Sequence, residues 1–132
     1  MASPIIAILV AGLAGWIFGA IWYGLLGKVW QRAQGLDPEA CKGQKMPLAP
    51  MAISFVCEFV MALILSWLLS GLGVLDVMGG AISGLTLGVG FMATSILVNN
   101  SFQGRKLMLS LIDGAQWIAV AVIQGVVLVL LS

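Results

Sequence analysis

Four long apolar stretches, separated by short polar segments, make up most of the chain. They cover about residues 4–34, 48–70, 76–98 and 106–131. A helix needs about 20 apolar residues to cross the hydrocarbon core of a bilayer, and each stretch is at least that long. Because lipid offers no partner for backbone N–H and C=O groups, runs of this kind cross it as helices. The pattern therefore predicts one all-α domain, a membrane protein built as a four-transmembrane-helix bundle.

The composition agrees with a lipid environment. Of the 132 residues, 61% are hydrophobic and 8% are charged. Soluble globular domains contain roughly 45–50% apolar and about 25% charged residues. With a net charge of +1, the chain also has no basic surface of the kind that binds nucleic acid. We therefore expect membrane lipids as partners and no nucleic acid.

The positions of the basic residues predict the orientation of the bundle. All six lie in or beside the first and third connections: Lys28, Arg32, Lys42, Lys45, Arg105 and Lys106. Lys and Arg next to transmembrane helices remain in the cytoplasm. The two termini and the second connection carry none. We expect both termini on the non-cytoplasmic side.

Small residues recur at every fourth position of the first and third predicted helices: Ala7, Ala11, Gly15 and Gly19, then Gly80, Gly84 and Gly88. Residues four apart lie on one helix face. Small residues allow membrane helices to approach closely. These stripes therefore predict close helix packing, within one chain or between chains. Together with acids inside so short a chain, they favour a homo-oligomer.

Two acids lie within the predicted spans. Glu58 is near the middle of the second helix, and Asp113 is closer to the cytoplasmic end of the fourth. An ionised side chain at the bilayer centre costs ~2.5–3.5 kcal/mol, so Glu58 should face the interior, find a partner or be protonated. Gln116 and Gln124 share a helix face with Asp113, and Asn99 ends the third helix on the same side. These five residues form the candidate polar site.

Three functions remain open. In the first, the polar site is a pocket for a proton, a small cation or a cationic ligand, as in a carrier or channel. Alternatively, its residues form interhelical hydrogen bonds that fix the bundle, and the protein has no activity beyond that. In the third, the cytoplasmic ends with Arg105 and Lys106 bind lipid headgroups or a partner, as in an accessory subunit.

The aromatic residues fit structural roles. Trp22, Tyr23 and Trp30 lie around the cytoplasmic end of the first helix, where Trp and Tyr are enriched at the membrane interface. Trp16 and Trp117 lie deeper, and we assign both to packing.

Catalytic chemistry is not indicated. The chain has no histidine, which is the usual general base and the commonest metal ligand. It has no glycine-rich phosphate loop and no serine elbow. Cys41 lies in a polar loop and Cys57 in an apolar run, unlike a disulfide framework or a zinc site. We predict no enzymatic activity, no cofactor and no metal.

Three segments carry a family pattern: residues 19–31, 59–69 and 90–125. Their most specific parts are the run Trp22, Tyr23 and Gly24 and the cluster Asn99, Phe102, Gly104 and Arg105. In these segments the chain resembles a bacterial membrane family labelled domain of unknown function 1761. The resemblance implies a compact four-helix domain in the bacterial inner membrane, and it implies no activity.

The chain departs from that family at two places. Where the family usually has Tyr-His, this chain has Gln116 and Trp117, so a role for a family histidine cannot be carried over. The family position that matches Glu58 is usually apolar, which makes this acid either a feature particular to this protein or a helix partner acquired locally.

Overall fold

The computed structural model describes residues 4–43 and 47–132, so the predicted basic position Lys45 lies outside the described residues. Its elements are α1 (Pro4–Ala33), α2 (Leu48–Gly71), α3 (Val77–Leu87), the π-helical turn η1 (Gly88–Ala93), α4 (Thr94–Phe102) and α5 (Leu107–Leu130). The segments α3, η1 and α4 run on as one helix. The described residues thus contain four helices long and apolar enough to cross a membrane, and no strand. The all-helical prediction is confirmed for this part of the chain.

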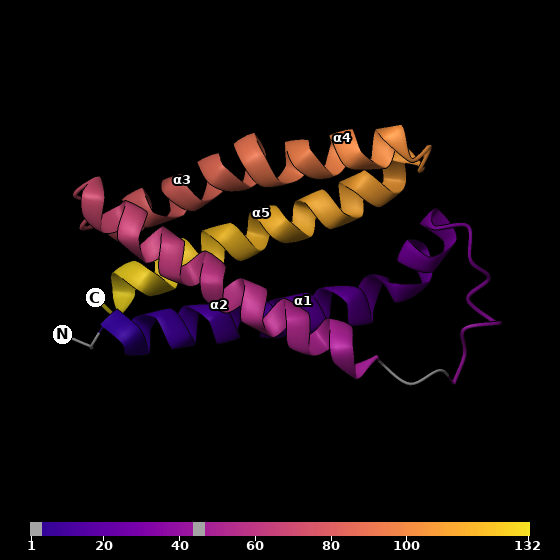
Figure 1. Ribbon diagram of the computed structural model, residues 1–132, viewed down its shortest axis with the longest axis horizontal. Coiled ribbons are helices and arrows are strands. Elements are labelled where there is room, and N and C mark those ends of the chain that lie inside the picture. The colour runs from indigo at the N-terminus through magenta and orange to yellow at the C-terminus, as the bar shows by residue number, and fades with distance from the viewer. Residues whose placement is uncertain (1–3, 44–46) are drawn as a thin grey trace.

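The helix α5 lies at the centre of the bundle. It packs on α1, on α2 and along the whole of α3, η1 and α4, whereas α2 packs mainly on α1. In Figure 1, both chain ends lie at one end of the molecule, which we call the terminal end. The α1–α2 connection and the α4–α5 turn lie at the other.

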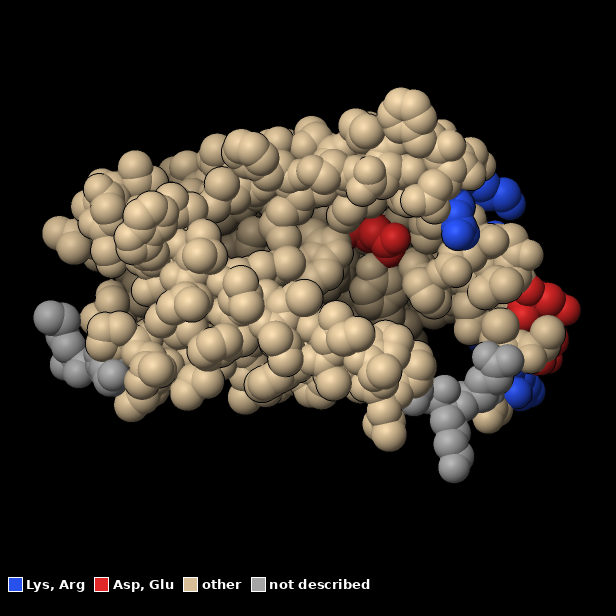
Figure 2. Space-filling model, viewed as in Figure 1, with Lys and Arg blue, Asp and Glu red and all other residues tan. Residues whose placement is uncertain are grey.

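We call this second end the basic end. It carries Lys28, Arg32 and Lys42 from α1 and the first connection, and Arg105 and Lys106 from the α4–α5 turn. Figure 2 shows charged side chains gathered there, while the rest of the visible surface is almost free of charge. The charge asymmetry of the sequence therefore becomes an asymmetry between the two ends of the folded molecule.

Close packing between α3 and α5 depends on glycine. Gly80 and Gly125 approach so closely that a Cβ on either would overlap the carbonyl oxygen of the other. One turn on, a Cβ on Gly84 would overlap the carbonyl oxygen of Ala121. The small-residue stripe of the third helix thus lies against α5 of the same chain.

The stripe on α1 is also buried within the chain. Its first three residues, Ala7, Ala11 and Gly15, are buried, and Gly19 is half-buried. A Cβ on Gly15 would lie 2.9 Å from the Glu58 Oε1 and 2.9 Å from the Val120 Cγ1. The glycine therefore leaves the space that the Glu58 side chain occupies.

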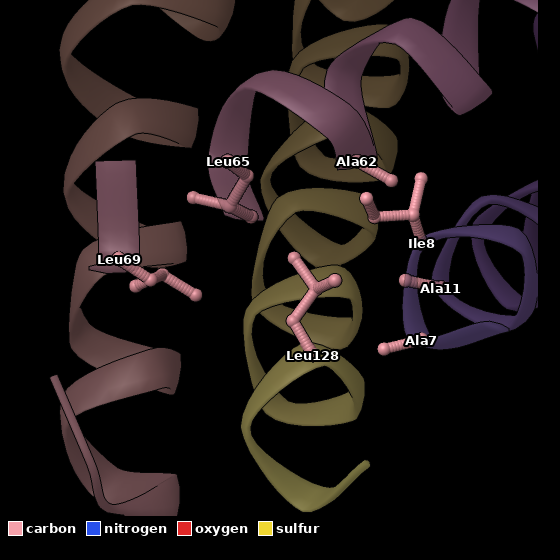
Figure 3. Packing of buried hydrophobic residues seen from close by; sticks show 7 residues of the cluster. All are labelled: Ala7, Ile8, Ala11, Ala62, Leu65, Leu69 and Leu128. Carbon is pink, nitrogen blue, oxygen red and sulfur yellow. The ribbon is translucent and has the colours of Figure 1, made fainter. Parts of the chain in front are cut away.

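An apolar core fills the terminal half of the bundle. Its buried members come from three helices: Ala7, Ile8, Ala11, Ala62, Leu65, Leu69 and Leu128. Figure 3 shows these side chains meeting between α1, α2 and α5. None of these side chains carries a polar group, so ordinary apolar packing holds this core together.

The third long helix extends further than its sequence pattern predicted. It ends at Phe102, four residues beyond the expected end at residue 98. The break comes at Gly104, whose φ of 67° lies in the left-handed region that favours glycine. The polar residues before it continue the helix, because their backbone groups pair within it. At the other end of this helix, Asp76 is the N-cap and accepts from the Gly79 N–H at 3.3 Å.

The π turn changes the register of this helix, which the sequence pattern did not predict. Up to Gly88, every fourth residue faces α5. Beyond the π turn, Ala93 also faces α5, since its Cβ lies against Gly114. A π turn closes over one residue more than an α turn. Every residue after Ala93 is therefore rotated by one position from the face that regular α-helical spacing assigns to it.

Candidate functional site

A small cavity of about 170 Å³, lined mostly by apolar surface with a few polar groups, lies between α1, α2 and α5. Aromatic, polar and small residues line it: Trp16, Gly19, Ala20, Tyr23, Met51, Ser54, Glu58, Gln116 and Trp117. The cavity thus brings one candidate acid and one candidate amide together with three aromatic rings.

Glu58 is the deeper of the two acids. Its side chain is only 2% exposed, and its Oε1 has no hydrogen-bond partner among the described residues. Neither α2 nor α5 contains a Lys or Arg that could pair with it. Buried polar atoms are nearly always bonded, so an exception of this kind indicates strain, a role in function or an absent partner.

Two glutamines of α5 lie on either side of this acid. The Gln124 Nε2 donates to the Glu58 backbone oxygen at 3.1 Å, which joins α5 to α2. Gln116 lines the cavity, is 3% exposed, and has an Oε1 without a hydrogen-bond partner in the described part of the chain. A Cβ on Gly19 would lie 3.0 Å from the Gln116 Nε2, so the glycine makes room for the amide. Gln124 therefore fastens two helices, and Gln116 offers an unused acceptor.

Asp113 is held separately, nearer the basic end. Its Oδ1 accepts from the Tyr23 hydroxyl at 2.6 Å and from the Trp30 Nε1 at 3.2 Å. Residues 23 and 30 lie two turns apart on one face of α1, and their ring centroids are 5.4 Å apart. Because Tyr23 also lines the cavity, its hydroxyl connects the cavity with Asp113.

Asn99 is the candidate that lies apart from the others. It is exposed, whereas Asn100 is half-buried and its Nδ2 donates to the Ser110 Oγ at 3.1 Å. The π turn explains the exchange, since it rotates the following residues by one position. Asn99 was a candidate because it ends the predicted third helix on the same side as Asp113; in the structure its neighbour Asn100 makes the contact with α5.

The sequence did not reveal the aromatic lining of the cavity. Trp16 was assigned to packing, and its Nε1 does join two helices by donating to the Met51 oxygen at 3.2 Å and the Ser54 Oγ at 3.1 Å. It also lines the cavity, as do Tyr23 and Trp117. Residues 16 and 23 are two turns apart on one face of α1. That spacing was the available signal, but it does not identify what the face meets.

The family-motif residues lie towards the basic end. Trp22, Tyr23 and Trp30 pack against a second apolar cluster of Ala33, Leu109 and Ile112. Gly24 and Phe102 are exposed, Gly104 forms the α4–α5 turn, and the Arg105 N–H donates to the Asn100 oxygen at 2.9 Å. The motif thus holds α1 and α5 together and shapes the turn.

These features define an all-helical protein with a small, partly open cavity between its long apolar helices, lined by aromatic residues and a few polar groups. The chain belongs to the family described as "Protein of unknown function (DUF1761)", whose model matches residues 6–129. The resemblance seen in the sequence is thereby confirmed. No curated protein and no solved structure matches the chain. The family brings no activity with it, so function has to be argued from the cavity.

Proposed function

We propose that the protein is a multi-pass protein of the bacterial inner membrane that binds a proton or a small cation at Glu58 and carries it. One observation supports this most directly. Glu58 lines the cavity, and its buried Oε1 has no hydrogen-bond partner among the described residues. An acid at that depth is costly, and without a structural bond in return it favours a functional role.

The membrane setting is supported by the outer surface of the bundle. Large apolar side chains are exposed along its whole length, for example Ile53, Trp67, Phe91 and Leu111. Monomeric soluble proteins rarely expose apolar patches of this extent. Since Lys and Arg stay in the cytoplasm, we place the basic end inside and both termini outside.

The apolar core supports a carrier rather than an open channel. Towards the terminal end, the space beyond Glu58 is closed by core residues such as Ala62 and Leu65. Towards the basic end, Tyr23 and Asp113 continue from the cavity with a hydroxyl and a carboxyl group. A site closed on one side and polar on the other is the arrangement that a carrier needs, because a channel would require a continuous path.

The homo-oligomer remains a prediction. Its basis was that a short chain would not bury two small-residue stripes and an acid by itself. Both the α3 stripe and most of the α1 stripe are buried within one chain, as is Glu58. These features therefore do not require a second copy of the chain.

Proton flux into liposomes tests the proposal. Wild type, Glu58→Gln and Glu39→Gln would be reconstituted with a trapped pH-sensitive dye, and a pH step applied with a potassium leak to balance charge. We expect wild type and Glu39→Gln to move protons, since Glu39 is exposed in the α1–α2 connection. Glu58→Gln should fall to the background of empty liposomes.

Glu58→Gln changes shape very little, and thermal melting in detergent would confirm that it folds. Equal flux in wild type and Glu58→Gln would contradict the proposal. Background flux in all three proteins would contradict proton carriage.

A further inference from the structure

We propose that the cavity binds a small organic ammonium ion that has at least one N–H, that is, a protonated amine with small apolar substituents. This inference rests on the proposed role of Glu58 as a cation site and adds the chemical class of the cation. It comes from three features that meet in one cavity: a carboxylate, an amide oxygen without a donor, and aromatic rings.

Two unpartnered acceptors account for the charge and the N–H. The Glu58 Oε1 and the Gln116 Oε1 are both buried, and neither has a hydrogen-bond partner in the described residues. A buried acceptor without a donor loses the bonds that it made in water. Both residues line the cavity, so an ammonium ion bound there lies beside a carboxyl and an amide group that can turn to accept its N–H, and its positive charge suits the Glu58 carboxylate.

The aromatic residues account for the organic part. Trp16, Tyr23 and Trp117 line the cavity. Cations are attracted to the faces of aromatic rings, most strongly to Trp, and the attraction grows when water is excluded. Alkyl groups on the nitrogen also bury apolar surface against the same rings. One ligand class therefore uses both the acidic and the aromatic parts of the lining.

A bare metal ion fits this lining less well. Hard cations such as Ca²⁺ take about 6–8 oxygen ligands. Here the lining offers one carboxyl group and few other oxygens, and the Ser54 Oγ already accepts from the Trp16 Nε1. The described residues also contain no cluster of three or more His, Cys, Asp or Glu suited to a metal. The donor set favours a cation that forms few hydrogen bonds and large apolar contacts.

The volume limits the size of the ligand. The cavity measures about 170 Å³, whereas drug-sized ligands occupy sites of about 300–1,000 Å³. The amine is therefore small, and trimethylammonium is a suitable probe because it has one N–H and three methyl groups.

Calorimetric titration of the detergent-solubilised full-length chain tests the inference. Trimethylammonium chloride would be titrated into wild type, Trp117→Leu and Trp67→Leu. We expect saturable binding to wild type and an affinity about fivefold lower in Trp117→Leu, the effect of losing one ring–cation contact. Trp67→Leu should bind as wild type does, since Trp67 is 72% exposed and lies outside the cavity.

Two further titrations test the charge. Glu58→Gln should bind trimethylammonium about tenfold more weakly, because a charge-assisted hydrogen bond is lost. tert-Butanol has a similar shape without the charge, and sodium chloride has the charge without the methyl groups. Neither should show saturable binding to wild type.

Equal affinities in wild type and Trp117→Leu would overturn the inference, as would tert-butanol binding as tightly as trimethylammonium. If trimethylammonium does not bind while proton flux still depends on Glu58, the ammonium site is wrong and the carrier stands. If trimethylammonium binding depends on Glu58 and Trp117 but no protein moves protons, the ammonium site stands and proton carriage is wrong.

Discussion

In the terminal half of the bundle the interior is filled by apolar and small side chains, while in the basic half it is filled by aromatic and polar ones. Leu65 and Leu128 represent the first kind of contact, and the Tyr23–Asp113 hydrogen bond represents the second. In lipid, helices associate mainly through close packing, and polar contacts contribute modestly. The comparison indicates that the terminal half supplies most of the stability. The basic half holds buried polar groups, and the free-energy cost of burying them is better explained by function.

The largest expected effect comes from disturbing the glycine contacts between α3 and α5. Gly84→Ala should lower the free energy of unfolding by about 3 kcal/mol, because its Cβ overlaps the backbone of α5 and the helices must move apart. Gly90→Ala is the matched control, since a Cβ there meets nothing within 4 Å. Unfolding in detergent, followed by circular dichroism, measures both. Equal stabilities would show that close packing does not support this half.

A second pair of variants compares a buried amide that bonds two helices with one whose oxygen has no donor. Gln116→Leu should raise the free energy of unfolding by about 1 kcal/mol, because it removes a buried acceptor that has no donor. Gln124→Leu should lower it by about 1 kcal/mol, because it removes the hydrogen bond to the Glu58 oxygen. The same unfolding assay applies. A loss of stability in both variants would mean that Gln116 is a structural residue.

The smallest expected effect concerns the hydrogen bond between α1 and α5. Tyr23→Phe should lower the free energy of unfolding by about 0.6 kcal/mol, the average for a hydrogen bond between membrane helices. A double-mutant cycle with Asp113→Asn measures the coupling directly. Strictly additive effects would show that the 2.6 Å contact contributes nothing to stability.

Sequence periodicity was sufficient for the general architecture. Long apolar runs predicted the helices, because length and composition alone determine whether a helix can cross a bilayer. Four-residue spacing placed Gly80, Gly84 and Gly88 on one face, and the structure shows that this face meets α5. Up to Gly88, local spacing was therefore enough to predict which side of a helix packs.

The candidate site was less predictable, because its geometry depends on how helices lie against each other. The helical spacing on α5 placed Asp113, Gln116 and Gln124 on one face. It could not show that the Tyr23 hydroxyl donates a hydrogen bond to Asp113, or that the Gln116 Oε1 has no donor among the described residues. The distance between α1 and α5 decides this, and no pattern within one helix contains that distance. The same limit hid Trp117 as part of the cavity lining.

The π turn at Gly88–Ala93 has a consequence for aligning this chain with other members of its family. A relative whose helix is regular there would be one residue shorter in that segment. In an alignment, a single-residue gap between Gly88 and Ala93 would then mark a local change from π to α winding. The contacts with α5 before and after the turn would be the same in both proteins. An alignment without the gap would pair Asn99 of this chain with the inward-facing residue of such a relative, although Asn100 is its spatial counterpart.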